Sequence, residues 1–491
     1  MSGRVRFAGV LLGAVLAAGA CLPCRGASRA LAYQLDVSRC KVPTMASLRQ
    51  KIDLLAALGY NQLQLYFEHT FAYSRHESVW RTASPLTAGE VRELDAYCAA
   101  RGIELVPSQN SFGHMERWLR HPEYNDLAEV PQGGAKVPAW GNYVIPTATT
   151  LCPTDPRSLE LVAGLYDELL PCFRSRKLNV GCDETLELMD PSAAGRSAAE
   201  IAARGWESVY FDFLMKIHGL VAARGHEMMF WGDMLLARPA FAKRVPKDAI
   251  ALVWGYEANQ PFDRDVGLVS TNGCRCYVCP GTSAWGSIFG RVPNMIANVD
   301  RAVEAAEKYG AEGLLLADWG DGGHPNPWLV SLPGLVYTAH RAKGEKLSRA
   351  ELAAAIDRIT GGAVGEALLE LGEAYLKTGG RTGNSTELFL LLRDDLEYRR
   401  AAGVTDASLA ASLAAIRAAL GKANLDGARE WVKDDWAMLA LLTEALEARL
   451  AEPGKRNFRA MFEPRYRALW LRQNRIGGLD ESLTWLFGRM R

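Results

Sequence analysis

The chain has 491 residues, long enough for two or three domains or for one large barrel with an additional domain. Its 56 Lys and Arg residues balance its 56 Asp and Glu residues, so no overall charge attracts nucleic acid or an acidic membrane. Hydrophobic residues form 49% of the chain, and the 13 tryptophans suit either a core or a cleft in which flat rings pack on sugars.

The first thirty residues have the pattern of an export signal. Arg4 and Arg6 give a positive start, and the apolar run at residues 7–20 is too short to span a bilayer as a mature helix. Residues 28–30, Ser-Arg-Ala, form a plausible cleavage site, whereas Cys21 after Ala-Gly-Ala offers a lipid-anchor site. We expect an exported protein, periplasmic or secreted, with a lipid anchor or an uncleaved anchor as the alternatives.

Most of the following chain alternates strand-like and helix-like segments. The predicted strands cover residues 31–39, 61–69, 103–111, 177–184, 227–234, 249–256, 275–285 and 313–321. Between the first two strands, Leu48, Ile52 and Leu55 recur at helical spacing, and Thr87 can cap a later helix with Glu90 three residues on. Eight successive strand–helix units predict an α/β fold, a (β/α)₈ TIM barrel rather than an open doubly wound sheet.

Two segments depart from this alternation. Residues 114–150 form a long insert after the third strand, rich in Gly and Pro, which we interpret as a loop at the barrel rim. Beyond residue 345, apolar residues at helical spacing, such as Leu409 and Leu413 and then Trp436 and Leu439, predict an α-helical C-terminal domain. The predicted organisation is a signal peptide at 1–30, a catalytic barrel at 31–344 and a helical domain at 345–491.

Polar and aromatic residues gather where the predicted strands end, the face on which barrel enzymes build their sites. In chain order they are Asp36, Arg39, Glu68, His69, Asn110, His114, Asp183, Glu184, Trp231, Asp233, Trp254, Tyr256, Trp285, Asp318, Trp319, Asp321 and His324. Acids, one arginine and several tryptophans on one rim predict a glycosidase pocket. The rings would wall the sugar, the arginine and outer acids would hold hydroxyls, and a carboxyl pair would move protons.

Each of these residues also has a plain structural explanation. A single Trp at a strand end is more often part of a core, and Arg39 can simply pair with Asp36. Asp183 and Glu184 can also open a helix and cap it. The glycosidase hypothesis therefore depends on the joint placement of these residues.

Three cysteines, Cys274, Cys276 and Cys279, form a local cluster. The spacing is open to a zinc site, a local disulfide or simply buried thiols, and it lacks a clear fourth zinc ligand.

The segment KLNVGCDETLEL, residues 177–188, resembles the strand-four signature of glycoside hydrolase family 20, the β-N-acetylhexosaminidases, which carries an Asp-Glu pair. NSFGHM, residues 110–115, resembles the Gly-His element of the same family. The resemblance spans about residues 32–340 and is to the short hexosaminidase D-like branch, because the signal leads almost directly into the first strand. The sugar-binding arginine, the pocket tryptophans and the final acid of the family match Arg39, Trp231, Trp254, Trp285, Trp319 and Asp321.

This resemblance implies an exo-acting, retaining β-N-acetylhexosaminidase that removes terminal GlcNAc or GalNAc from glycans, without a metal or organic cofactor. In the family, the 2-acetamido oxygen of the substrate attacks the anomeric carbon and forms an oxazolinium ion, an exception to the two-carboxylate scheme. Glu184 is implied as the acid that protonates the leaving oxygen. Asp183 is implied as the carboxylate that holds the acetamide N–H and offsets the developing positive charge.

Further roles and two departures accompany the resemblance. Tyr277 stands in the strand-seven Tyr-x-Asp element, where it is implied to donate to the acetamide oxygen, but Cys279 replaces the acid. Asn110 stands where many relatives have Asp. His114 is expected either to tune the Asp-Glu pair or to be structural, and Glu68 to contact a sugar hydroxyl. Two alternatives remain. One is a glycosidase for a modified (for example sulfated) or non-acetamido sugar, and the other is a sugar-binding barrel without catalytic activity.

Overall fold

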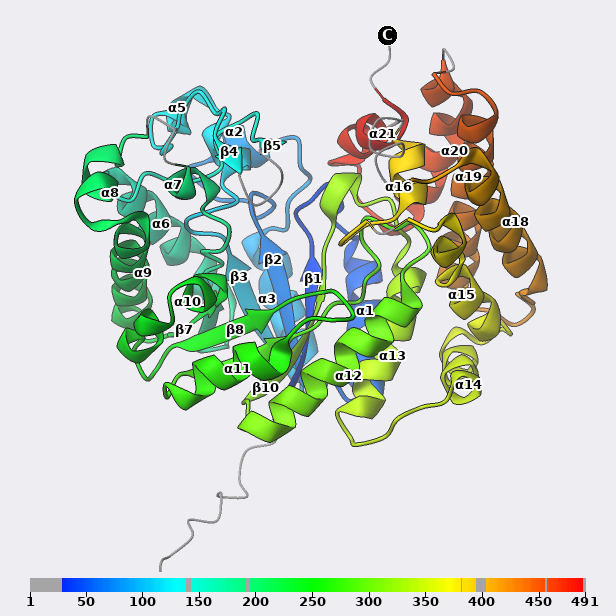
Figure 1. The fold of residues 1–491 in the computed structure, drawn as a ribbon, viewed down its shortest axis with the longest axis horizontal. Helices are drawn as coiled ribbons and strands as arrows, with labels where there is room; N and C mark the ends of the chain where they lie inside the picture. The colour runs from blue at the N-terminus through cyan, green and yellow to red at the C-terminus, as the bar shows by residue number, and fades with distance from the viewer. Residues whose placement is uncertain are drawn as a thin grey trace, which may run out of the picture.

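The computed structural model describes residues 29–137, 143–190, 195–380, 382–393, 403–454 and 457–488. Eight parallel strands close into a barrel in the order β1-β10-β9-β8-β7-β6-β3-β2, and β4 and β5 form a separate antiparallel pair (Figure 1). The strands are β1 Ala30–Asp36, β2 Gln62–Phe67, β3 Glu104–Gln109, β4 Lys136–Val137, β5 Tyr143–Val144, β6 Lys177–Asn179, β7 Glu227–Trp231, β8 Ile250–Trp254, β9 Arg275–Cys279 and β10 Gly313–Asp318.

Helices follow the barrel strands and continue beyond the last of them. Those up to the end of the barrel are α1 Met45–Leu58, α2 Glu77–Trp80, α3 Ala88–Ala99, α4 Glu116–Leu119, α5 Pro122–Asn125, α6 Pro156–Leu169, α7 Leu186–Met189, α8 Ala198–Arg204, α9 Trp206–Ala223, α10 Asp233–Ala237, α11 Phe262–Thr271, α12 Val292–Tyr309 and α13 Leu332–Arg341. The C-terminal helices are α14 Arg349–Thr360, α15 Gly365–Leu371, α16 Glu387–Leu392, α18 Asp406–Lys422, α19 Glu430–Ala451, α20 Phe458–Gln473 and α21 Leu479–Phe487.

The structure confirms the predicted barrel and the helical region that follows it. Each of the eight predicted segments overlaps one barrel strand, although the strands are shorter than predicted. The seventh and the fourth differ most: β9 already ends at Cys279, and β6 ends at Asn179 and leaves Asp183 and Glu184 in a loop. Thr87 caps α3 as expected, since its side chain accepts a hydrogen bond from the backbone N–H of Glu90 in a capping box.

The barrel interior changes character along its length. Its lower part is polar: the Gln64 amide donates to Gln62 at 3.2 Å and accepts from Asn179 at 3.1 Å. Towards the strand ends the interior becomes aromatic, with a buried cluster that includes Trp231 and Trp319. This aromatic part of the interior faces the loops that follow the strands, where barrel sites are built.

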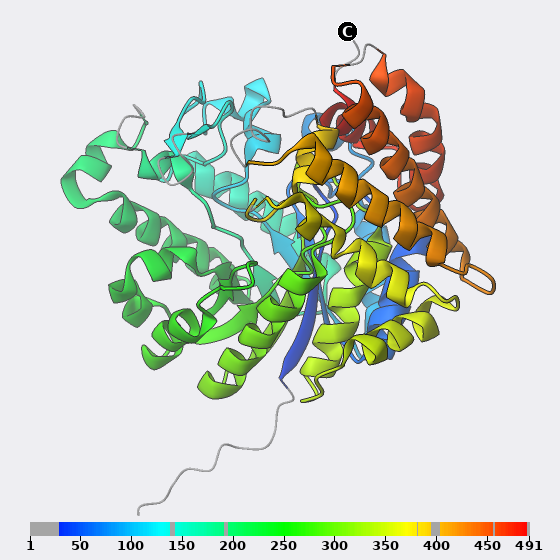
Figure 2. The same cartoon turned by 45° about the vertical axis from the view of Figure 1, so that its right-hand side comes forward.

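The C-terminal helices pack against one side of the barrel, and two of their segments reach the rim. Figure 1 shows α16 and α21 at the same end of the molecule as α5 and the β4–β5 pair, and Figure 2 shows the same arrangement after a turn of 45°. Helix α21 packs on the turn at Asp321–Gly323 that follows β10. A Cβ atom on Gly323 would collide with Trp485 of α21, so the two segments approach closely.

The predicted export signal falls almost entirely on residues 1–28, which lie outside the described residues. Export and a lipid anchor therefore stay predictions. Within the described ranges, no helix combines the length and apolar character that crossing a bilayer requires.

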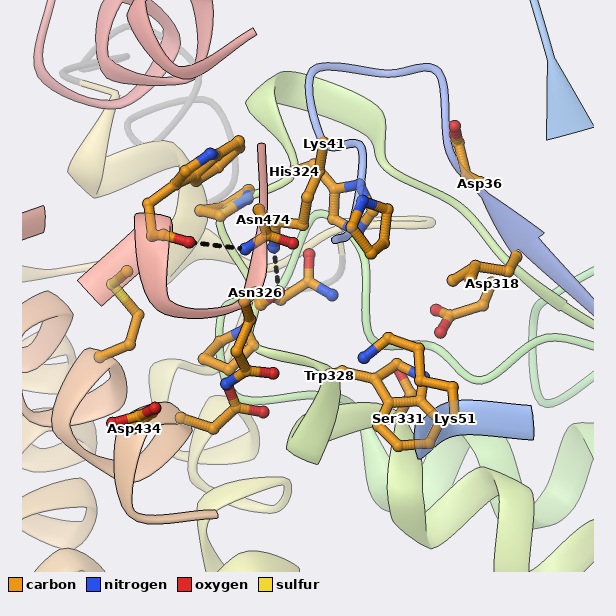
Figure 3. Close-up of a pocket in the computed structure, with 18 of the residues that line it drawn as sticks. Asp36, Lys41, Lys51, Asp318, His324, Asn326, Trp328, Ser331, Asp434 and Asn474 are labelled. Carbon is orange, nitrogen blue, oxygen red and sulfur yellow. Dashed lines mark hydrogen bonds between the residues drawn. The ribbon is translucent and has the colours of Figure 1, made fainter. Parts of the chain in front are cut away.

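A small polar cavity of about 40 Å³ lies where β1 and β10 meet the C-terminal helices (Figure 3). Two lysines face it: the half-buried Lys41 donates to the Asn326 carbonyl at 2.8 Å, and the ammonium of the buried Lys51 lies 4.0 Å from the Trp328 ring centroid. Asp435 of α19 accepts from the Leu329 backbone N–H at 2.9 Å and so joins the helices to the barrel. We call this group the junction cluster.

Burial strongly affects the lysines of the junction cluster. Burial lowers the pKa of Lys51 to about 8, although the carboxylates of Asp435 and Asp318 act in the opposite direction. The pKa of Lys41 is lowered to about 7, also chiefly by burial. The folded protein therefore holds two lysines whose charged forms are less favourable than they are in the unfolded chain.

We predict that Lys51→Met stabilises the protein at pH 7 and that this gain fades as the pH rises. Between the folded pKa of about 8 and the unfolded value of about 10.4, only the unfolded chain keeps the proton, so the stability of the wild type rises with pH. The shift corresponds to about 3 kcal/mol at neutral pH, at about 1.4 kcal/mol per pKa unit. Thermal unfolding of both proteins from pH 7 to pH 10 measures this difference.

Lys216→Met is the matched control, because Lys216 is exposed on α9. Asp435 keeps its hydrogen bonds from Leu329 and Gln473 in the Lys51 variant. A difference between wild type and Lys51→Met that stays constant across this pH range would contradict the prediction.

Candidate active site

The loop after β6 presents Asp183 and Glu184 through an unusual backbone. Gly181, Cys182 and Glu184 all have left-handed conformations, with φ of 66°, 67° and 47°. Such angles are uncommon for non-glycine residues and concentrate at functional sites. The acids do not cap the next helix, because α7 begins after Thr185 without a side-chain capping bond. The structural explanation for the pair as a helix cap therefore fails.

Both carboxylates converge on His114, which follows β3. Its Nε2 atom lies 3.3 Å from Asp183 Oδ2 and 3.5 Å from Glu184 Oε2. Burial alone would lower the pKa of His114, but the Asp183 carboxylate outweighs it and raises the pKa to about 10. At neutral pH the site therefore contains an imidazolium between two carboxyl groups.

The loops after β3 and β6 interlock through two glycines. A Cβ atom on Gly113 would collide with the backbone carbonyl of Asp183, and one on Gly181 would collide with the Asn110 side chain. The Asn110 amide in turn donates to the Tyr66 hydroxyl at 2.6 Å. The Gly-His element is thus required by contact, since only glycine lets the backbone of one loop lie against the other.

The insert after β3 fixes the far side of the acidic loop. Glu187, three residues after Glu184, accepts hydrogen bonds from the backbone N–H and hydroxyl of Thr149, at 2.6 and 2.8 Å. Thr150 binds the same carboxylate through its N–H and its hydroxyl. The predicted rim loop therefore positions the catalytic candidates.

Arg39, after β1, connects the remaining charged candidates. Its guanidinium lies 3.0 Å from Asp321 and 3.3 Å from Glu68, and its Nη2 lies 3.4 Å from Nδ1 of His114. It also pairs with Asp36 at 3.7 Å, so the plain structural pairing exists within a larger network. Asp321 is the most open of these acids, with 44% of its side chain exposed.

Glu68 lies behind Arg39 and is fully buried, so the structure does not place it against the cavity. It lies between Arg39 and Arg117, and Arg117 makes a two-pronged ion pair with Glu481 of α21 at 2.6 Å. Burial raises the pKa of Glu68 to about 7, although both guanidiniums act to lower it. The expected contact of Glu68 with a sugar hydroxyl is thus replaced by support of Arg39.

Other acids and histidines from the strand ends serve the framework. The Asp36 carboxylate accepts backbone N–H groups of Ser38, Arg39 and Gly320, which joins the loops after β1 and β10. Asp318 accepts from Tyr33 and Thr282 at 2.6 and 2.7 Å. His324 faces the junction cluster (Figure 3), and His69 is buried beside Ser38.

Aromatic rings form the walls. Trp254, Tyr256 and Trp319 line the cavity, and Trp231 and Trp285 stand behind them with ring centroids 5.6 Å from Trp319 and 5.0 Å from Tyr256. The Trp319 indole N–H donates to the Tyr256 hydroxyl at 2.8 Å, which leaves the hydroxyl proton of Tyr256 free to point elsewhere. The sequence places Tyr256 at a strand end but indicates no role for it.

The expectation for Tyr277 is wrong in position. Tyr277 pairs with Gly313, the first residue of β10, so it lies at the opposite end of the barrel from the acids. Its ring fills the space that the missing side chain of Gly313 leaves, and it is absent from the cavity lining. The strand register puts Cys279, rather than Tyr277, at the end of β9.

The cysteine cluster consists of buried free thiols. Cys274 donates to the Ala242 carbonyl at 2.8 Å, and all eight cysteines in the described residues are free and buried. Within that part of the chain, no group of three or more His, Cys, Asp or Glu side chains is arranged to hold a metal ion.

These elements enclose a cavity of about 230 Å³. It is lined by Arg39, His114, Asp183, Glu184, Trp254, Tyr256, Trp319, Asp321 and Asn384. Several buried polar atoms at this site lack a hydrogen-bond partner among the described residues, including Asp183 Oδ1, Trp254 Nε1 and Asp233 Oδ1. Because buried polar groups are normally paired, this concentration of unpaired atoms is typical of a site that a ligand or water completes.

The acids of the site are not equivalent. Burial raises the pKa of Glu184, His114 lowers it and Asp183 raises it, and the net shift is upward. Asp233, whose carboxylate lies 3.4 Å from the Glu184 backbone nitrogen, has a strongly raised pKa because it is buried beside Asp183 and Glu184. The geometry therefore combines two carboxyl groups of raised pKa with the imidazolium beside Asp183.

The family profile described as glycosyl hydrolase family 20, catalytic domain, matches residues 31–311, more than half of the chain. The chain belongs to glycosyl hydrolase family 20. Hexosaminidase D from Homo sapiens is 26% identical over 223 residues, which cover 44% of this chain and 43% of the human protein. A beta-hexosaminidase from Akkermansia muciniphila is 28% identical over 218 residues, 40% of this chain and 43% of that protein.

The match thus spans less than half the length of these two curated relatives. Among solved structures, a chitobiase from Flavobacterium johnsoniae has a TM-score of 0.54 and 16% identity, covering 94% of this chain and 78% of that one. At this identity the likeness concerns the fold alone. The family 20 assignment agrees with the resemblance seen in the sequence.

We predict that Asp183→Asn lowers the pKa of His114 markedly below 10. The Asp183 carboxylate is the main cause that raises it, and burial then acts unopposed except by Glu184. A histidine side-chain NMR titration from pH 5 to 10 measures the effect. Asp318→Asn is the control, because Asp318 contacts Tyr33 and Thr282 instead. An unchanged His114 titration in Asp183→Asn would contradict this assignment of the charge pair.

Proposed function

We propose that this family 20 glycosidase is an exo-acting, retaining β-N-acetylhexosaminidase that removes terminal β-linked GlcNAc or GalNAc by substrate-assisted catalysis. The observation that supports this most directly is the convergence of Asp183 and Glu184 on His114 inside the aromatic cavity. The cavity of about 230 Å³ is smaller than the range of roughly 300–1,000 Å³ typical of drug-sized ligands, which fits one sugar residue. A site for a single sugar suits removal of terminal residues.

In the first step, the carbonyl oxygen of the 2-acetamido group attacks the anomeric carbon as the glycosidic bond breaks. Glu184 gives its proton to the leaving oxygen, a role that its raised pKa favours. The Asp183 carboxylate, held beside the His114 imidazolium, accepts the acetamide N–H and offsets the positive charge of the oxazolinium. Opposite protonation states in one loop thus serve opposite tasks.

In the second step, water attacks the anomeric carbon and gives a proton to Glu184. The bond to the acetamide oxygen breaks, the acetamide is restored, and the anomeric configuration of the substrate is retained. Arg39 and Asp321 hold hydroxyls of the sugar, while Trp254 and Trp319 contact its apolar faces. The Tyr256 hydroxyl, which accepts from Trp319, donates to the acetamide oxygen, the role that sequence had assigned to Tyr277.

An assay on 4-nitrophenyl β-GlcNAc, β-GalNAc and the same sugars without the acetamido group tests this proposal. We expect turnover of the acetamido substrates alone, inhibited by a thiazoline that mimics the cyclic intermediate. Glu184→Gln is expected to lose turnover by a factor of about 10² to 10⁴, the usual contribution of a general acid, while it still binds the sugar. Asp183→Asn is expected to lose rate as well, because the acetamide is no longer held for attack.

The outcomes separate the alternatives. Turnover of the sugars that lack the acetamido group would contradict substrate assistance. Turnover restricted to sulfated or otherwise modified substrates would favour a modified ring, an alternative kept open because β9 ends in Cys279 rather than an acid. Binding of sugars without any turnover would favour a binding protein.

The two tyrosines give a sharper test of the site geometry. We predict that Tyr256→Phe lowers kcat by at least tenfold, since a donor aimed at developing charge contributes on the order of 10² in rate. Tyr277→Phe is the matched control, because Tyr277 lies away from the cavity. Steady-state kinetics on 4-nitrophenyl β-GlcNAc compares the two variants, and a thermal melt of each shows that it is folded. A larger loss in Tyr277→Phe would overturn the placement of the two rings.

Exported location is likewise a proposal, based on the signal-like pattern of the first thirty residues.

A further inference from the structure

Eight of the nine residues that line the cavity come from the strand ends and loops of the barrel, and the ninth, Asn384, comes from the C-terminal region. We infer that Asn384 is a substrate-binding residue whose side-chain amide contacts a hydroxyl of the sugar. This inference rests on the proposed function and adds a specificity determinant from outside residues 31–311, the part that the family profile matches.

The segment that carries Asn384, residues 382–386, is firmly attached to the barrel. The backbone N–H of Asn384 donates to the Glu257 carboxylate at 2.7 Å. The hydroxyl of Ser385 and the backbone N–H of Thr386 both donate to the Gly286 carbonyl, at 2.8 and 2.9 Å. A loop tied to two different barrel loops holds its side chains in a defined place, which substrate recognition requires.

The two anchoring points are themselves fixed. Arg291, which is almost fully buried, makes a two-pronged pair with Glu257 at 3.0 Å. A Cβ atom on Gly286 would lie 2.9 Å from the Asn384 carbonyl oxygen, so the backbones are in close contact. The buried Glu387 carboxylate, directly after the segment, accepts from Thr378, which precedes the segment, and from Thr382, its first residue. The segment is therefore part of the folded site.

The position of Asn384 complements the other polar groups. Glu257 directly follows Tyr256 in the loop after β8, and Gly286 lies in the loop after β9. In the order of the closed barrel, β9 lies across from β3, which His114 follows, and next to β10, which Asp321 follows. Asn384 thus supplies a polar side chain near the end of β9, where the expected acid is replaced by Cys279.

The chemistry of the side chain suits a sugar hydroxyl. Among the described residues, no protein group makes a hydrogen bond with the Asn384 amide, and an amide can both donate and accept, as a hydroxyl does. Asn384 also has a left-handed backbone, with φ of 53°, which asparagine tolerates better than most residues. The alternative is that Asn384 has only a structural role, in which asparagine is present because it tolerates this left-handed backbone.

The experiment separates the two roles because glycine adopts the left-handed conformation freely. Asn384→Gly keeps the backbone and removes the amide. We expect kcat/KM on 4-nitrophenyl β-GlcNAc to fall about tenfold, mainly through KM, as the loss of one hydrogen bond to a neutral group predicts. Gly383→Ala is the matched control in the same segment, since nothing lies within 4 Å of the added Cβ atom. Melting temperatures of both variants confirm folding.

The same variants are assayed on the 3-, 4- and 6-deoxy forms of the substrate. We expect wild type and Asn384→Gly to have the same kcat/KM, within about twofold, on the one analogue that lacks the contacted hydroxyl. An unchanged kcat/KM in Asn384→Gly, or an equal loss on all analogues, would overturn the inference while leaving the proposed function intact. Absence of wild-type turnover on every acetamido substrate would overturn the proposed function, and the inference with it.

Discussion

The active-site candidate depends on one half-buried cation, the guanidinium of Arg39. It lies within ion-pair distance of Asp36, Glu68 and Asp321 and beside His114, which itself contacts Asp183 and Glu184. Carboxylates removed from water are costly unless a partner and hydrogen bonds compensate them. Arg39 therefore makes it possible to gather acids from four strand ends around one sugar-sized space. Its planar fork of donors suits this better than a lysine ammonium.

This network also explains why the C-terminal helices matter to the site. Glu481 of α21 neutralises Arg117, Arg117 faces Glu68, and Glu68 supports Arg39. The same helix, α21, also packs on the turn that contains Asp321. The charges of the cavity are thus continuous with charges that the helical region contributes. The barrel provides the catalytic candidates, and the helices help to hold them.

The barrel and most of the site were predictable because both follow from local pattern. Apolar strands alternate with helices, and the strand ends of a barrel meet at one face, so Arg39, His114, Asp183 and Glu184 could be placed together from spacing alone. The prediction for Tyr277 is wrong for a physical reason. The register of a strand sets how deep each side chain lies in the barrel, and Tyr277 lies deep because it pairs with the first residue of β10. The predicted sugar contact of Glu68 is wrong because the sequence does not show that Arg39 lies between Glu68 and the cavity. Asn384 is far along the chain, and only tertiary packing brings it to the cavity.

The left-handed backbone at Gly181, Cys182 and Glu184 affects the order in which parts of the molecule fold and unfold. Local conformational preference works against this loop, and its shape is imposed by neighbours: the loop that contains Gly113 and the threonines that bind Glu187. Such a loop acquires its shape only after those neighbours have packed. Mild denaturation or a distant destabilising substitution would then release the acids while strands and helices persist, so that activity is the most fragile property of the fold.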